Sequence, residues 1–440
     1  MQNDKINLSL VLPIGLMLFS FFFGAGNLIF PPILGQMSGE NLTAATIGFC
    51  LTGVGFPLLG ILAMAINRSD SPESMGMPVG KMYARIVAVM AALTIGPFFA
   101  IPRTAAVSFD TGILTLLPDG FGTVGLAIYS IFFFGLTYFL SINPSQIVSN
   151  IGKIMTPMLL LCLGILLFFV ITDPMGPLQA AQGSYQTHAF FKGFQEGYNT
   201  MDLLAAILFG AATVTTIERT GVKDQAQLTR LCIYAGLIAA SCLALIYAAL
   251  SYAGAVSTAA LGIIPNGGLL LNTIAVHYMG FAGNIVLALI IFFACITTSI
   301  GLTTAIAEYF AELSNGQMQY QRLVIYICLF SLVVSNFGLN NIIVFSLPVI
   351  FTLYPIIIAL VILNAGRGIF HGDKTIFRVT MTLTTITAIF DGLKVAGLTG
   401  ASVEAFLDAY LPLYDIGFGW VVPCFGGIVI GFIISKILKK

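Results

Sequence analysis

Residues 10–35 read LVLPIGLMLFSFFFGAGNLIFPPILG, an apolar run long enough to cross a membrane but interrupted near its middle. The interruption is GAGN at 24–27, followed by Pro31 and Pro32. Glycine weakens a helix and proline removes a backbone donor, so the sequence predicts an unwound joint. Freed N–H groups would then bind a carboxylate, and freed carbonyls a cation. A close helix crossing is the alternative, because small residues favour it too.

The rest of the chain is equally apolar. Its 440 residues are 58% hydrophobic and only 8% charged, against about 25% charged residues in a soluble domain. A soluble fold could not cover that much apolar surface, whereas a lipid bilayer accepts it. The 18 basic and 18 acidic residues balance, which gives no indication of a nucleic-acid partner. We therefore expect an all-α integral membrane protein.

The apolar segments predict twelve transmembrane helices, and the first is expected to be retained because no small-residue cleavage site follows it. Twelve spans place 15 of the 18 Lys and Arg residues on one side, which predicts that both termini are cytoplasmic. The spans are expected near 8–34, 42–66, 86–113, 121–141, 151–172, 198–217, 231–254, 282–310, 322–338, 342–364, 376–397 and 416–437.

The sixth span repeats the irregularity of the first. Tyr198, Asn199, Thr200 and Asp202 cluster at its outer end. Broken helices at corresponding positions in two halves are typical of an inverted repeat. The sequence thus predicts a 5+5 inverted-repeat core with broken helices 1 and 6 plus two accessory helices. The repeats would cover residues 1–172 and 173–364, and the accessory helices residues 365–440.

The eighth span carries five serine and threonine side chains within FFACITTSIGLTTAIAEYF, among them Thr297 and Thr298. Such groups often bond their own helix backbone. Beside a broken first helix, however, they would offer hard oxygen ligands of the kind that suits Na⁺.

Ionisable residues inside the predicted spans are candidates for function because they are costly to insert. Asp202 is the strongest candidate, since it lies on the second broken helix. Arg103 is expected to bind substrate or gate the outer vestibule, or else to form a structural pair with a neighbouring helix. Asp391 and Lys394 are three residues apart on the accessory eleventh span, which predicts a local ion pair.

Four motifs carry a resemblance to a known family: FFFGAGNLIFPP, GPFFAIPRTAAVSF, GYNTMD and FFACITTSIGLTTAIAEYFAEL. Together they resemble the bacterial branched-chain amino acid transport system II carriers, which belong to the branched-chain amino acid:cation symporter family. The resemblance runs essentially end to end. It implies uptake of leucine, isoleucine and valine coupled to Na⁺ or H⁺, the fold of the amino acid–polyamine–cation transporters, and residence in the bacterial plasma membrane.

A weaker resemblance links the first span to the sodium-coupled leucine and neurotransmitter transporters. It implies that the amino acid binds around Gly24, Ala25, Gly26 and Asn27. It also implies a cation site at Ser20, Phe23, Ala294, Thr297 and Thr298. The arginine gate of that distant group is absent after Asn27, and Arg103 is our candidate for its replacement. Tyr198, Thr200 and Asp202 complete the expected substrate site.

We therefore predict a secondary symporter with no cofactor other than its coupling ion. The chain has no G-x-x-x-x-G-K-[ST] motif, so the energy is expected to come from a gradient. A channel would need rings of polar residues, and an enzyme would need a catalytic constellation. Neither pattern is present. A carrier for another small amine, amino acid or nucleobase on the same fold stays open, because Asp202 would also suit a cationic substrate.

Overall fold

The structure, a computed structural model, describes residues 8–67, 71–118, 120–143, 148–219, 221–222, 224–370 and 372–438. Regular structure in this part of the chain is entirely helical. The first half contains α1 (Leu8–Phe22), α2 (Ala25–Ser38), η1 (Gly39–Asn41), α3 (Leu42–Cys50), η2 (Leu51–Gly55), α4 (Phe56–Ile66), η3 (Pro72–Met75), α5 (Lys81–Leu93), η4 (Thr94–Phe98), α6 (Ala100–Val107), η5 (Ser108–Ile113), η6 (Leu114–Leu116), α7 (Gly122–Ser141), η8 (Val148–Met155) and α8 (Thr156–Thr172).

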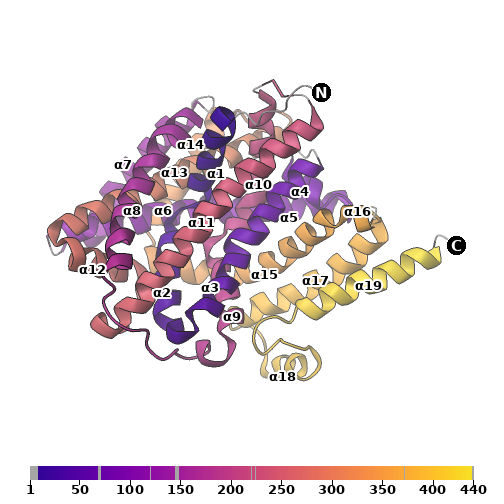
Figure 1. Cartoon of the computed structure of the whole chain (residues 1–440). Coiled ribbons are helices and arrows are strands. Elements are labelled where there is room, and N and C mark those ends of the chain that lie inside the picture. The colour runs from indigo at the N-terminus through magenta and orange to yellow at the C-terminus, as the bar shows by residue number, and fades with distance from the viewer. Residues whose placement is uncertain are drawn as a thin grey trace.

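The second half contains α9 (Tyr185–Glu196), η9 (Gly197–Thr200), α10 (Asp202–Arg219), α11 (Gln225–Leu261), α12 (Gly267–Met279), α13 (Phe281–Leu313), α14 (Tyr320–Ser335), α15 (Leu339–Ala365), α16 (Arg367–Phe370), α17 (Lys374–Val395), α18 (Ala401–Tyr410) and α19 (Val421–Leu438). The long helices pack side by side into one bundle. The C-terminal α17 packs between α15 and α19 along one edge of it (Figure 1).

Each of the twelve predicted spans coincides with helix. By length and composition, nine helical stretches within the described ranges can cross a membrane, or ten if the bent pair Tyr185–Thr200 and Asp202–Glu218 counts as one span. The apolar helices Leu10–Phe22 and Tyr320–Ser335 are shorter. The exact number of spans therefore stays a prediction. The basic residues Lys5, Arg68, Lys223, Lys439 and Lys440, which enter the predicted orientation, lie outside the described residues, as do both chain ends.

The outside of the bundle is apolar, as a lipid-facing surface must be. Phe139 on α7, Leu161 and Phe168 on α8 are each more than 60% exposed. A water-soluble protein rarely exposes large apolar side chains in contiguous patches of this kind. The helices and this surface together describe a multi-pass membrane protein.

The connections are more ordered than the sequence suggested. The stretches 173–197 and 255–281, the two longest connections between the predicted spans, contain α9 and α12, and α11 itself continues to Leu261. The Asn266 side chain accepts hydrogen bonds from the Gly268 and Leu269 N–H groups and so caps α12. Polar residues of this kind begin a helix as readily as they mark a loop, which explains the difference.

The two prolines of the first span also behave differently from expectation. Pro31 and Pro32 lie inside α2, and the helix continues through them. Each proline removes one donor, so the carbonyls of Asn27 and Leu28 lose their usual partners one turn earlier. A membrane helix tolerates this when neighbouring helices cover the freed groups. The joint in the first span therefore comes from the segment before α2 and not from the prolines.

α2 and α11 cross at very short range. A Cβ atom added to Gly35 would lie 1.7 Å from the Ser251 carbonyl oxygen, and one added to Gly254 would lie 1.9 Å from the Pro32 carbonyl oxygen. Backbone on both sides leaves no room for a side chain to move aside. The small residues of α2 thus serve close packing at its C-terminal half, the alternative that the sequence offered for GAGN.

We predict that Gly35→Ala lowers the thermal stability of the purified protein, because the added methyl group overpacks a backbone crossing. The cost of overpacking is typically about 1–3 kcal/mol. The matched control is Gly164→Ala on α8, where a Cβ atom would meet nothing within 4 Å. Thermal unfolding in detergent should show a lower transition temperature for Gly35→Ala alone. Equal transitions in both variants would contradict the close crossing.

Candidate functional site

The first span is interrupted at Phe23 and Gly24. In a continuous helix the Gly24 N–H would donate to the Ser20 carbonyl, four residues earlier. It donates instead to Asn27 Oδ1, at 3.1 Å. Gly24 is extended, with φ −118° and ψ −156°, and α2 begins at the next residue. The break therefore frees the Ser20 carbonyl from its helical donor and uses the Asn27 side chain to stabilise the joint.

The sixth span is interrupted at Met201. This residue has φ 63°, in the left-handed region that residues other than glycine rarely adopt. The helical segments before and after it meet at 49°. After the break, the Asp202 N–H donates to Thr200 Oγ1 at 3.3 Å, and the Leu203 N–H donates to the Tyr354 hydroxyl at 3.4 Å. Side chains thus take up donors at the start of α10 that no preceding helical turn can satisfy.

The two breaks are joined by hydrogen bonds between buried side chains. Asn27 Nδ2 donates to Asp202 Oδ2 at 2.7 Å, and the Tyr247 hydroxyl donates to the same oxygen at 2.9 Å. Asn27 Nδ2 also contacts the Tyr247 hydroxyl. All three side chains are at most 2% exposed. A carboxylate so deep in an apolar bundle needs such partners, because burying an unpaired charge is very costly.

Arg103 lies at the same junction. Its Nη1 donates to the Asn199 carbonyl at 2.9 Å, and its guanidinium lies 5.8 Å from the centre of the Phe30 ring. A Cβ atom on Gly26 would lie 2.8 Å from Arg103 Nη2, so only glycine lets the guanidinium come this close to α2. Arg103 Nε is buried and has no hydrogen-bond partner among the described residues. Arg103 thus links the two breaks and keeps a donor available.

A narrow cavity of about 20 Å³ lies where these groups meet. Its charged and amide side chains are Asn27, Arg103 and Asp202. The remaining wall is mostly apolar and comes from spans one, three, six and eight. Its residues are Phe21, Phe22, Gly24, Ala25, Asn27, Ile95, Ala100, Arg103, Thr104, Thr200, Met201, Asp202, Ala205, Thr298 and Leu302. In this closed form the cavity has room for little more than one water molecule. Its mixed lining would suit a small molecule with both charged and aliphatic parts once the helices separate.

The freed Ser20 carbonyl faces the hydroxyl side chains of α13. Thr297 Oγ1 and Thr298 Oγ1 donate to it at 3.2 and 3.1 Å. Thr297 Oγ1 also lies 2.8 Å from the Phe293 carbonyl and 3.2 Å from the Ala294 carbonyl. Each hydroxyl has one hydrogen to donate, so oxygen acceptors outnumber donors in this cluster. An oxygen cluster of this composition could coordinate a hard cation.

The predicted site residues fall into two groups. Gly24, Ala25, Asn27, Arg103, Thr200, Asp202 and Thr298 line the cavity. Ser20, Ala294, Thr297 and Thr298 form the oxygen cluster. Gly26 lies under Arg103, as described above. Tyr198 is outside the cavity lining, and its ring stacks on Tyr354 with centroids 4.4 Å apart. Phe23 lies in the break, but neither threonine hydroxyl bonds its carbonyl among the contacts of the described chain.

Three residues of the site escaped the sequence analysis. Met201 forms the second break although methionine gives no sign of a left-handed backbone. Tyr247 completes the Asn27–Asp202 network. A polar phenol in the middle of the apolar seventh span could have indicated that this residue has a buried hydrogen-bond partner. Thr156 Oγ1 lies 2.7 Å from Ser20 Oγ and thus ties the fifth span to the residue whose carbonyl belongs to the oxygen cluster.

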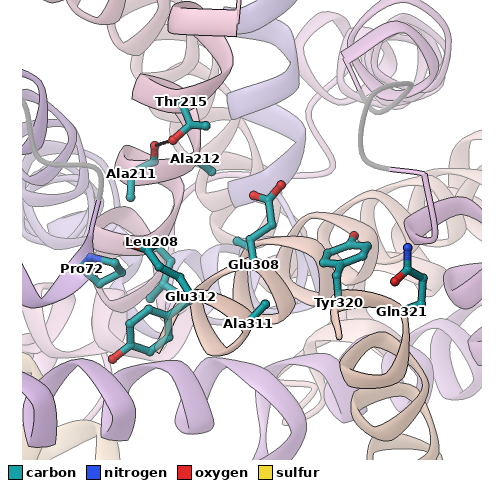
Figure 2. Close-up of a pocket in the computed structure, with 12 residues that line it drawn as sticks. Pro72, Leu208, Ala211, Ala212, Thr215, Glu308, Ala311, Glu312, Tyr320 and Gln321 are labelled. Atoms are coloured by element: carbon teal, nitrogen blue, oxygen red, sulfur yellow. Dashed lines mark hydrogen bonds between the residues drawn. The ribbon is translucent and has the colours of Figure 1, made fainter. Parts of the chain in front are cut away.

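A second, larger cavity lies further along α10 and α13. It has a volume of about 480 Å³, and its walls include Leu208, Ala212 and Thr215 of α10. Glu308 of α13 points into it between Thr215 and Tyr320 (Figure 2). Counting along α10, the cavity residues follow Asp202 and Ala205 at steps of three or four, which keeps them on one helix face. One continuous face of α10 therefore borders both cavities.

Comparison with known proteins identifies relatives over the whole length. Residues 8–438 match the family model described as branched-chain amino acid transport protein. The chain is 42% identical over 439 residues to the branched-chain amino acid permease BrnQ of Bacillus subtilis, covering 100% of both chains. It is 38% identical to the branched-chain amino acid transport system 2 carrier protein of Pseudomonas aeruginosa, covering 98% of this chain and 97% of the other.

Among solved structures, the fold resembles that of Mhp1, a nucleobase-cation-symport-1 family transporter, in a closed conformation with bromovinylhydantoin bound. The TM-score is 0.62, and the match covers 98% of this chain and 92% of Mhp1. The sequences are only 13% identical. This similarity therefore concerns the fold alone.

We predict that Asn27→Ala destabilises the protein, because it removes partners from the Gly24 N–H, Asp202 and Tyr247 together. Each buried polar group left unpaired costs about 1–3 kcal/mol. The control is Asn341→Ala, since the exposed Asn341 side chain bonds the Phe337 carbonyl in the turn just before its own helix and no other group of the described chain. Thermal unfolding in detergent should separate the two variants clearly. A transition for Asn27→Ala as high as that of the control would contradict the proposed role of this network.

Proposed function

This chain belongs to the branched-chain amino acid transport protein family, and we propose that it is a secondary carrier that imports leucine, isoleucine and valine together with a cation. The observation that carries the proposal is 42% identity over the full chain to a relative named as a branched-chain amino acid permease. The relatives are named permeases and transport carriers, which confirms that the chain is a carrier and not an enzyme.

The proposed architecture is twelve spans with both termini in the bacterial cytoplasm. Residues 1–172 and 173–364 would form the two inverted five-helix repeats, and residues 365–440 the accessory pair. In support, helix occupies every predicted span, and the breaks lie in the first and sixth. The fold shared with a cation-symport transporter supports it as well.

The substrate is proposed to bind between the two breaks with its charged groups at the polar side chains of the cavity. The first-turn N–H groups of α2, at Ala25 and Gly26, lack a preceding helical turn to bond. Together with the positive end of the helix they suit a carboxylate. The Asp202 carboxylate, on the opposite side of the joint, suits the ammonium group.

The aliphatic side chain is proposed to lie against Ile95, Ala100 and Leu302. These residues line the cavity from the third and eighth spans. They offer a branched side chain an apolar surface, and each buried methylene contributes about 0.8 kcal/mol. A nucleobase or a purely cationic amine would leave the N–H groups of α2 without an anion, which favours an amino acid over these alternatives.

The coupling ion is proposed to be Na⁺, bound by the Ser20 and Ala294 carbonyls and the Thr297 and Thr298 hydroxyls, with the Phe23 carbonyl nearby. The excess of oxygen acceptors over donors in this cluster supports the proposal. Because the Ser20 carbonyl is freed only by the break, the cation would favour the broken form of the first span. Moving one charge inward adds about 2.3 kcal/mol per 100 mV to the driving force.

Release is proposed to follow the shared face of α10 into the larger cavity. Asp202 and Ala205 line the substrate cavity, and Leu208, Ala212 and Thr215 line the larger one. Under the proposed orientation this larger cavity opens to the cytoplasm. Arg103, bonded to the Asn199 carbonyl on the other side of the substrate cavity, would then close the outward route.

We predict saturable uptake of labelled leucine, isoleucine and valine into proteoliposomes under an inward Na⁺ gradient. Thr298→Ala should reduce this uptake at least about tenfold, since a lost ligand worth 1.4 kcal/mol changes binding tenfold. Thr387→Ala should leave it unchanged, because Thr387 bonds only its own helix on α17. Uptake driven by H⁺ alone would exclude the Na⁺ site and turn attention to Asp202 and Glu308. The absence of uptake of all three amino acids in folded protein would contradict the substrate assignment.

We also predict that Ala212→Phe slows uptake while leucine still binds. The added ring would fill the release route beyond the substrate cavity, so transport and binding should separate. Ala260→Phe, at the exposed end of α11, is the matched control. Equilibrium leucine binding and proteoliposome uptake would be measured for both variants. Normal uptake by Ala212→Phe would place the route elsewhere.

A further inference from the structure

Asp391 on α17 is a buried acid that does not line the substrate cavity. Its side chain is 3% exposed, and neither carboxylate oxygen has a hydrogen-bond partner within the described chain. Burial of a carboxylate without partners is very costly. α17 is nevertheless packed closely here, because a Cβ atom on the next residue, Gly392, would lie 1.9 Å from Thr352 Oγ1. A group that pairs with the Asp391 carboxylate must therefore be a bound ion, a proton or a water molecule, and not a side chain of the described residues.

Lys394 lies within electrostatic range of Asp391, but within the described chain its direct ion pairs are with other carboxylates, so the predicted contact pair is not formed. Lys394 Nζ lies 3.6 Å from Asp408 Oδ1 and 3.8 Å from Glu404 Oε1, both on α18. It also donates to the Tyr414 carbonyl at 3.3 Å and lies over the Tyr414 ring. The ammonium group is thus held by the outer segment, and the spacing of three residues on one helix did not decide its partner.

Three further polar groups surround Asp391. The Tyr198 hydroxyl and the Tyr414 hydroxyl both lie within electrostatic range of its carboxylate, and Trp420 lies beside Tyr198. A Cβ atom on Gly419 would lie 3.3 Å from Asp391 Oδ1, which places the carboxylate against the loop before α19. The Tyr414 hydroxyl is buried without a hydrogen-bond partner in the described chain, and the Tyr198 hydroxyl and the Trp420 Nε1–H have no partner there besides each other. These three groups and the Asp391 carboxylate therefore face a common region.

A cavity of about 320 Å³ reaches this region from the outer end of the bundle, and Asp391 lines it. Its other charged wall residues are Lys192, Lys394 and Asp415. Lys192 is paired with Glu196 at 2.8 Å, and Lys394 with Glu404 and Asp408. Each ammonium group is thus offset by at least one carboxylate, while Asp391 and Asp415 add further negative charge. A cleft with this balance concentrates cations.

We propose that Asp391 anchors a second cation site, which takes a small monovalent cation, either Na⁺ or a proton. The cation neutralises the buried carboxylate. A bound Na⁺ also takes the oxygen atoms of the Tyr198 and Tyr414 hydroxyls, whereas a proton on Asp391 donates to one of them. The site is separate from the oxygen cluster at Thr297 and Thr298, and it does not depend on the identity of the transported amino acid.

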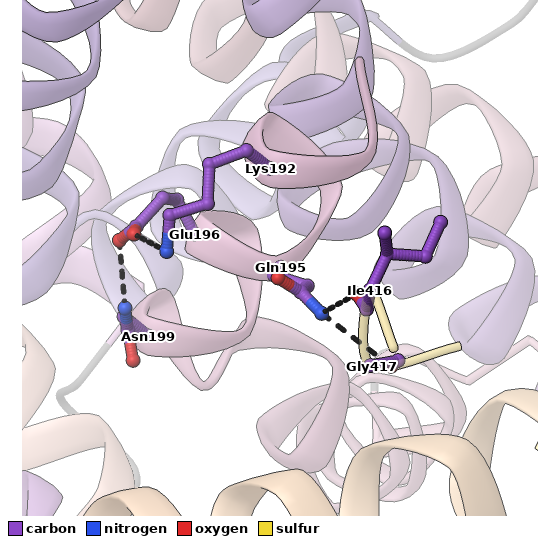
Figure 3. A network of polar contacts seen from close by, with 6 residues as sticks. All are labelled: Lys192, Gln195, Glu196, Asn199, Ile416 and Gly417. Carbon is purple, nitrogen blue, oxygen red and sulfur yellow. Dashed lines mark hydrogen bonds and ion pairs between the residues drawn. The ribbon is translucent and has the colours of Figure 1, made fainter. Parts of the chain in front are cut away.

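The site shares residues with the break in the sixth span. Tyr198 belongs to η9, and its ring stacks on Tyr354, whose hydroxyl accepts from the Leu203 N–H. One turn earlier, Gln195 Nε2 donates to the Ile416 carbonyl at 2.7 Å and so holds the loop that precedes Trp420 (Figure 3). Occupation of the Asp391 site and the position of η9 are therefore linked. Through these contacts the accessory helices would help to set the position of the outer half of the sixth span.

The test uses Trp420, the only tryptophan in the chain, as a reporter inside the site. Its fluorescence would be followed in the full-length protein in nanodiscs. In one arm Na⁺ replaces choline at constant pH and ionic strength, and in the other the pH is lowered without Na⁺. Other charged or titratable groups face this region, so each variant is compared with wild type in both arms. These groups are Tyr198, Tyr414, Lys394, Asp415, His188, Lys192, Glu404 and Asp408.

We expect a saturable change in Trp420 emission in one arm, which identifies the cation. Asp391→Asn should abolish it, and Asp415→Asn, which removes the same charge at the exposed rim, should keep it. Tyr198→Phe should shift it to higher cation concentration while preserving the stack on Tyr354. If Asp391→Asn does not fold, the response of Tyr198→Phe tests the proposed cation site in its place.

The proposal is overturned if wild type responds in neither arm, or if Asp391→Asn or Tyr198→Phe responds as wild type does. In either case the region holds only water. Leucine binding by the same preparations is measured in parallel. Its absence in wild type would count against the proposed substrate and leave the Trp420 result to stand by itself.

Discussion

One hydrogen bond between a backbone N–H group and a side chain determines the geometry of the broken first span. The Gly24 N–H donates to the Asn27 side chain at 3.1 Å and not to the Ser20 carbonyl of its own helix. That exchange ends α1, begins α2 and exposes a carbonyl to the threonines of α13. A broken backbone inside a membrane is tolerated only where protein or a cavity covers it. Here Asn27, Thr297 and Thr298 cover the break and a cavity lies beside it.

The same asparagine makes the two broken spans a single unit. Its amide donates to Asp202, which begins the second half of the sixth span, and Tyr247 bonds the same carboxylate oxygen. A change in the backbone position at one break therefore alters the hydrogen bonds at the other. The proposed binding of an amino acid and of a cation at this junction gives the two ligands a physical means of influencing each other. The face of α10 that borders both cavities offers the corresponding route inward.

Patterns along the chain were enough to predict an all-helical membrane protein and to find both breaks. GAGN and GYNTMD stand out because apolar helices otherwise have no reason to contain such residues. The left-handed Met201 could not be predicted, since methionine does not favour that backbone and only the packing around it imposes it. The free carboxylate of Asp391 was missed for a related reason. The ammonium group of Lys394 pairs with Glu404 and Asp408 on the following helix, α18, so packing between helices and not spacing along α17 decides its partner.

The central claim is that amino acid and cation bind at one junction and affect each other. The most direct measurement is equilibrium binding of labelled leucine to the purified protein at increasing Na⁺, together with binding of labelled Na⁺ at increasing leucine. Thermodynamic linkage requires the same factor in both directions. We predict that Na⁺ strengthens leucine binding and leucine strengthens Na⁺ binding equally, and that Thr298→Ala removes both effects. Leucine binding that is independent of Na⁺ in the wild-type protein would contradict this account.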